Sequence, residues 1–153
     1  MINKILYNNL TTKKVDLFEA NNFSIKFKPN WRQIRKFRNN NTLSFVNVKN
    51  DIGTLQISSF LNPEKNYNFD LNNSKSKVER NGFKPEIRDV SKYQSIFYGL
   101  NYVDENLYQF RFEFGNKNKR LLATLTFENN NKNIVEENYV KIVQILDTII
   151  FME

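Results

Sequence analysis

The residues of this chain best suited to recognising a partner are six cations and one tryptophan close to its start. They are Lys26, Lys28, Trp31, Arg32, Arg35, Lys36 and Arg38. No acidic residue occurs between positions 20 and 50. Such an excess of positive charge could steer an acidic partner, and tryptophan is enriched among residues that dominate binding energy. A solvated surface is the simpler interpretation of the charges, so both interpretations stay open.

The local conformation decides how these groups can act together. If residues 31–38 form one or two helical turns, Arg32, Arg35 and Lys36 share one side of them. Lys26 and Lys28 lie on the polar side of an alternating run and should point outward. For Trp31 we expect burial, as a large ring that holds the strand end against the sheet or the final helix. A partner-facing anchor is the alternative.

The residue types in this sequence offer few groups for catalysis. The sequence has no cysteine and no histidine, which removes thiol chemistry, the commonest general base and the usual zinc ligands. Asp104 and Glu105 are adjacent carboxylates in a predicted turn, and the SKSK run at 74–77 fits an exposed helix. A cluster of tyrosines around Phe97 could stack nucleic-acid bases, but aromatics on a sheet face below a helix are usually core. We therefore predict no catalytic, cofactor or metal site.

Length and composition indicate one domain. The chain has 153 residues, a formal net charge of +7 and sixteen acids spread among its cations. No apolar run near the start fits a signal peptide, and none approaches the ~20 residues that span a bilayer. We expect a cytoplasmic protein with a single domain over 1–153, in which residues 1–21 are a lead-in that forms either a short helix or an edge strand.

The elements that must position these groups can be read from hydrophobic periodicity. Residues 23–28 alternate and stop at Pro29, which predicts a half-buried strand. Residues 42–48 and 53–60 predict two more strands joined by a turn. Residues 68–81 predict a helix, with Gly82 just beyond it as a C-cap.

The second half predicts three strands, Tyr93–Asp104, Leu107–Gly115 and Arg120–Glu128, in a meander. In the middle strand Tyr108, Phe110, Phe112 and Phe114 share one face. Gly99 predicts a bulge or a close approach by another chain.

The cover for that face is predicted at the C-terminus. Asn133 and Glu136 fit a capping-box start, and Val135, Tyr139, Ile142, Leu146 and Ile149 form a helical stripe, which Ile150 widens. The fold class is α+β, an antiparallel sheet covered by a C-terminal helix and a second, shorter helix.

This order of elements resembles the PsbP-like fold superfamily. The similarity rests on Phe23, Ile25, Phe27, Pro29 and Trp31, where a first strand ends in proline and a tryptophan follows. The GTLQIS strand, the meander and the Ile/Leu-rich final helix extend it over residues 22–151, and the chain looks nearest to the bacterial domains of that superfamily. The resemblance implies a role in protein binding rather than catalysis, but it transfers no binding residues.

Three functions remain. The favoured one is a non-catalytic protein-binding domain, such as an adaptor, an effector chaperone or a toxin-immunity protein, with an acidic partner fitting the charge. The alternatives are a basic nucleic-acid-binding module and a small-molecule or lipid carrier with a pocket between sheet and helix.

Overall fold

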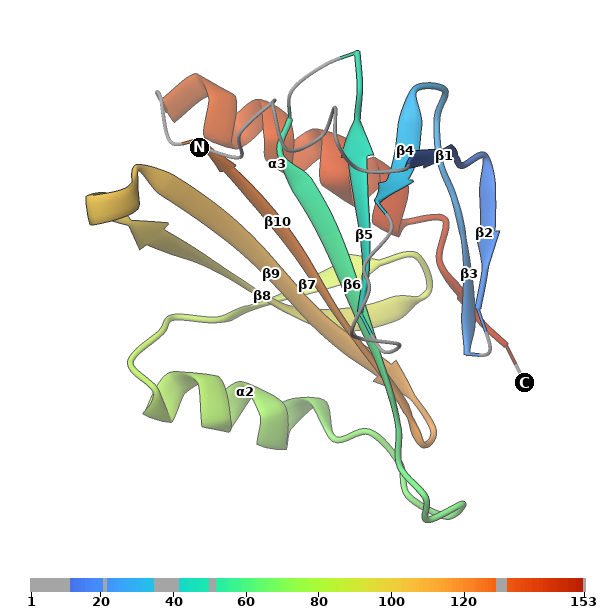
Figure 1. Cartoon of the computed structure of the whole chain (residues 1–153). Helices are drawn as coiled ribbons and strands as arrows, with labels where there is room; N and C mark the ends of the chain where they lie inside the picture. Colours follow the sequence, from blue (N-terminus) through green and yellow to red (C-terminus); the bar gives the residue numbers. More distant parts are fainter. Residues whose placement is uncertain (1–11, 21, 35–41, 50–51, 129–131, 153) are drawn as a thin grey trace.

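A computed structural model describes residues 12–20, 22–34, 42–49, 52–128 and 132–152. Its main feature is an antiparallel sheet of eight strands (Figure 1). In spatial order these are β1 (Thr12–Lys14), β4 (Trp31–Ile34), β5 (Thr42–Asn47), β6 (Thr54–Leu61), β10 (Lys119–Glu128), β9 (Leu107–Asn116), β8 (Tyr93–Tyr102) and β7 (Glu86–Val90). The predicted α+β class and the three-strand meander are confirmed.

The edge strand β7 was not predicted. It exposes Glu86, Ile87, Arg88 and Asp89. An edge strand with little burial has no alternating hydrophobic pattern. The strand predicted over Tyr93–Asp104 ends two residues earlier, at Tyr102. The three-residue 3₁₀ turn η1 (Val103–Glu105) follows it.

Residues 12–20 and 31–34 contain strands instead of the helices that were among the predictions. Within residues 12–20, β1 pairs with β4 and β2 (Leu17–Glu19) pairs with β3 (Phe23–Lys26), so this part of the lead-in forms strands. Residues 31–34 are not helical either. They form β4 between β1 and β5, where both backbone edges find partners. The remainder of 31–38 lies outside the described residues.

A second sheet of three strands, β11 (Ile150–Phe151), β3 and β2, was not predicted. It joins the C-terminal strand to the alternating run at 23–26 through the pairs Ile150 with Ser24 and Phe151 with Phe23. Such pairing between distant segments leaves no local signal. The prediction that Ile150 widens the helical stripe is wrong, because the helix ends four residues earlier and Ile150 is 50% exposed.

Helix α3 (Lys132–Leu146) covers one face of the large sheet. Ile142, Ile145 and Leu146 are buried in one core with Phe110, Phe112 and Phe114. The ring of Tyr139 lies 5.0 Å from that of Phe97, 5.7 Å from that of Phe110 and 6.1 Å from that of Phe112. The predicted cover is confirmed. Asn133 lies within the first turn of α3 rather than before it, so the predicted capping position is wrong.

Helix α2 (Leu71–Arg80) lies on the opposite face of the large sheet (Figure 1). Asp70 caps its start by accepting a hydrogen bond from the Asn73 amide at 3.0 Å. Gly82, with φ of +91°, donates to the Glu79 carbonyl after its end, as predicted. Only Val78 of the helix is fully buried, against Ile96, Tyr98 and Leu100 of β8. The short helix therefore covers only one side of this face.

We predict that Phe112→Ala lowers the unfolding free energy by about 3–5 kcal/mol, the usual cost of emptying an aromatic core site. Phe112 has no exposed surface and touches rings from both the sheet and α3. Chemical denaturation of the variant measures this loss. A change near zero would contradict the observed packing.

Candidate functional site

The corner between β3 and β4 positions Lys28 and Trp31, two of the predicted binding residues. The chain turns at Pro29 and Asn30, and Asn30 takes φ of +79°, a left-handed conformation that asparagine tolerates better than most residues. The Asn30 carbonyl accepts a hydrogen bond from the Val48 amide at 2.9 Å. This corner holds Lys28 and Trp31 beside one cleft.

The cleft has a volume of about 570 Å³ and lies where the second half of α3 passes the turn and the end of β5. We name it the lysine cleft, after Lys28, Lys49 and Lys141 in its wall. Lys28 Nζ donates to Gln144 Oε1 at 3.2 Å, which links the turn to α3. Trp31 is 2% exposed and its ring lies 5.6 Å from the ring of Phe27, so it lines the cleft as a residue of the core.

The charge of the lysine cleft is one-sided. All three lysines are exposed, and no Asp or Glu belongs to its described lining. The four ion pairs formed among the described residues do not involve these lysines. Neighbouring like charges that form no ion pair with the described residues attract an anionic group. The arrangement can therefore hold an acidic group.

The structure places Lys26 and Arg32 away from this cleft. Lys26 lies on the exposed side of β3 in the small sheet, where its amide donates to Thr148 Oγ1 at 2.9 Å. Arg32 alternates with Trp31 along β4 and so lies on the other face of the large sheet, with Nη1 donating to the Trp31 carbonyl at 3.1 Å. Arg35, Lys36 and Arg38 lie outside the described residues.

Two cations of the cleft were missed by sequence reasoning. Lys49 follows β5, and Lys141 comes from a helix more than a hundred positions after Lys28. Lys141 lies on the polar side of the helical stripe, which marks it as exposed. Only the packing of α3 across the sheet brings it to the turn.

The remaining candidates lie outside the lysine cleft. Asp104 and Glu105 are exposed in the 3₁₀ turn. Tyr98 stacks on Phe83 at 5.3 Å below α2, and Tyr93 packs on Phe151 at 4.8 Å. The close approach at Gly99 comes from within the chain, because a Cβ there would lie 2.4 Å from the Tyr108 hydroxyl.

The part of the chain that the structure describes contains neither a metal-binding cluster nor a membrane-spanning helix. No cluster of three or more Asp or Glu residues there could hold a metal ion. None of the helices in these ranges is long and apolar enough to cross a membrane.

A side-chain hydrogen bond to Glu86 raises the pKa of Arg88, which favours the charged guanidinium and so excludes it as a base.

The fold of this chain is similar to those of two solved structures. The solution structure of cyanobacterial PsbP (CyanoP) from Synechocystis sp. PCC 6803 superposes with a TM-score of 0.60 and 9% identity, covering 94% of this chain and 96% of that one. This chain has a PsbP-like fold. A crystal structure of a protein from Bacteroides thetaiotaomicron VPI-5482 is also similar, with a TM-score of 0.69 and 13% identity over 86% of this chain.

The PsbP-like chain spans 45% of the length of the Bacteroides protein. No family model matches its sequence, and no curated protein matches it. At these identities the likeness establishes the fold, whereas the function has to be argued from the surface of this chain.

For Trp31 we predict a mainly structural role. Trp31→Ala should lower the unfolding free energy by about 3–5 kcal/mol, because it removes a buried ring from the core. Denaturation, compared with the exposed Lys28→Ala, measures the difference. A Trp31→Ala variant of unchanged stability that no longer binds its partner would show instead that the ring is an anchor.

Proposed function

We propose that this chain is a non-catalytic protein-binding domain whose lysine cleft receives an acidic segment of another protein. The observation that carries the proposal is the convergence of Lys28, Lys49 and Lys141 around one open cleft whose described lining contains no acid. The partner is then an adaptor target, a secreted effector or a toxin, and we expect the encounter to occur in the cytoplasm.

The shape of the lysine cleft supports a protein segment as its occupant. Its lining includes the apolar residues Trp31, Ile52 and Ile145, which belong to the buried core. Its rim carries amides from Asn47 and Gln144. An apolar centre with a polar and charged rim is the usual anatomy of a protein interface.

The absence of histidine and cysteine from the whole sequence supports the non-catalytic part of the proposal. The PsbP-like fold is compatible with it. Nucleic acid is less favoured, because the aromatic rings of the large sheet pack under α3 instead of forming an open stacking surface.

We predict that the double reversal Lys28→Glu/Lys141→Glu slows association with an acidic peptide about tenfold at low salt, because charges at a rim act through electrostatic steering. The difference should shrink as added salt shortens the Debye length to about 8 Å or less. Biolayer interferometry with a glutamate-rich peptide measures the rates. Thermal unfolding should change little, because both side chains are exposed.

Lys65→Glu/Lys84→Glu supplies a control, since it also reverses two exposed cations, both of which lie outside the lysine cleft. Equal slowing by this control would mean that net charge acts rather than the cleft. A parallel titration with single-stranded polynucleotide tests the alternative. Tighter binding to the polynucleotide, with a steep dependence on salt, would replace the protein partner by nucleic acid.

To identify the natural partner, a photo-reactive phenylalanine analogue at Gln144 can be cross-linked in cells of the source organism. The proposal expects a protein adduct that disappears with Lys28→Glu. The same analogue at Val103, which is 77% exposed on the 3₁₀ turn, controls for random collisions. Adducts of equal yield at both positions would contradict a specific cleft.

A further inference from the structure

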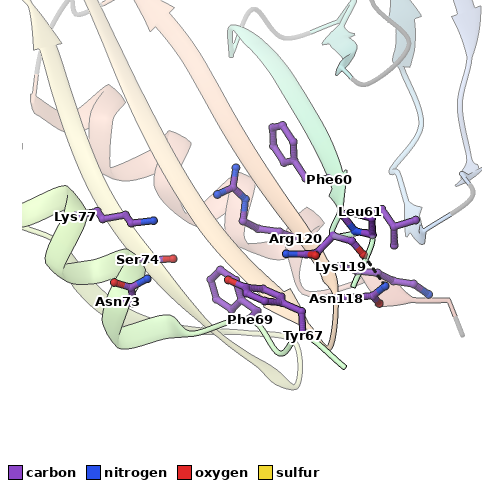
Figure 2. A pocket seen from close by; sticks show the side chains of 12 residues that line it. Phe60, Leu61, Tyr67, Phe69, Asn73, Ser74, Lys77, Asn118, Lys119 and Arg120 are labelled. Carbon is purple, nitrogen blue, oxygen red and sulfur yellow. Dashed lines mark hydrogen bonds between the residues drawn. The ribbon is translucent and has the colours of Figure 1, made fainter. Parts of the chain in front are cut away.

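A second cleft lies on the other face of the large sheet, between α2 and the ends of β6 and β10. Its volume is about 300 Å³, and it shares no residue with the lysine cleft. We name it the α2 cleft. Figure 2 shows side chains from α2 on one side, from β6 and β10 on the other, and the rings of Tyr67 and Phe69 below.

The floor of the α2 cleft is a loop tied firmly to the β9–β10 hairpin. The Asn62 amide donates to the Asn118 carbonyl at 2.7 Å, and Asn118 Nδ2 donates back to the Asn62 carbonyl at 3.0 Å. The Phe69 amide donates to the Lys117 carbonyl at 2.8 Å. The Phe69 ring rests on Gly115, where an added Cβ would lie 2.5 Å from its Cγ. The hollow is therefore preformed by backbone hydrogen bonds.

The polar groups of the α2 cleft are donors with spare capacity. Arg120 Nη1 lies 3.3 Å from Glu113 Oε1, and the guanidinium carbon lies 4.4 Å from the centre of the Phe60 ring. Arg120 Nε is buried and has no acceptor among the described residues. Because a guanidinium has five N–H donors, one carboxylate oxygen leaves most of them unused.

Two further cations, Lys77 and Lys119, line the same cleft. Lys119 alternates with Arg120 along β10, so its side chain points to the other face of the sheet. Neither lysine takes part in an ion pair with another described residue. No Asp or Glu is among the described residues that line the cleft, and Glu113 offsets one of the two positive charges, Arg120 and Lys77, on the α2 side. The rings of Phe60, Tyr67 and Phe69 supply flat apolar surface beside these charges.

From this juxtaposition we propose that the α2 cleft binds a small organic anion that carries a planar ring. The ring packs on Phe69 and Tyr67, and the anionic group faces Lys77 and the unused donors of Arg120. The volume lies at the lower end of the range for small-molecule pockets, which fits one ring with one substituent. This site is independent of the proposed protein partner.

Phenyl phosphate is the probe, with inorganic phosphate and phenol as its two halves. Titration into the isotopically labelled chain, followed by amide chemical shifts, should give saturable changes at Asn73, Ser74 and Lys119, which line the α2 cleft. Phenyl phosphate should bind at least about tenfold more tightly than either half, because each half loses one kind of contact. Trp31, the only tryptophan, lines the lysine cleft. Its fluorescence should therefore not change when phenyl phosphate is added.

Lys77→Gln should weaken phenyl phosphate about tenfold, the effect of losing one charge-assisted hydrogen bond. Lys75→Gln is the control, because it removes the same charge from the same helix at a position outside the lining. Lys75 is half-buried and pairs with Glu79 at 3.0 Å, whereas Lys77 is exposed, so thermal unfolding checks that both variants fold.

Four results would overturn the proposal. They are the absence of saturable shifts, shifts confined to other regions, equal affinity for inorganic phosphate alone, and equal weakening by Lys75→Gln. A response of Trp31 with no shift in α2 would place the anion in the lysine cleft instead.

Discussion

The packing of α3 on the aromatic face of the large sheet is the contact on which the rest of this structure depends. Tyr139 lies against the rings of Phe97, Phe110 and Phe112, and Ile142 and Leu146 have no exposed surface. Such burial supplies most of the driving force for folding. It also determines where the end of α3 lies, and hence where Lys141 and Gln144 meet the turn at Pro29.

The two faces of the large sheet have different chemistry. Beneath α3 the face is apolar, whereas side-chain hydrogen bonds cross the opposite face, such as Gln109 Nε2 to Thr126 Oγ1 at 2.8 Å. A ten-residue helix with one fully buried side chain can cover only part of that second face. The uncovered part carries Arg120 and Phe60 beside α2. The α2 cleft thus follows from the shortness of its helix.

The small sheet anchors the C-terminus and the corner that carries the lysine cleft. Phe151 pairs with Phe23, and its amide donates to the Tyr93 hydroxyl at 3.0 Å, so one strand touches both sheets. Thr148 accepts a hydrogen bond from the Lys26 amide just before this strand. The two clefts share no lining residue, so the two proposed ligands would not compete.

Hydrophobic periodicity predicted the three-strand meander and the stripe of α3, and the backbone limits of proline predicted the strand end at Pro29. These signals act over a few residues, and the size of the Trp31 ring favoured its burial. The cleft shared by Lys28, Lys49 and Lys141, and the outward positions of Lys26 and Arg32, arise from packing between distant segments. The pairing of β11 with β3 arises in the same way. Such contacts are selected by burial of the whole core, and exposed charges carry no periodic signal of their own.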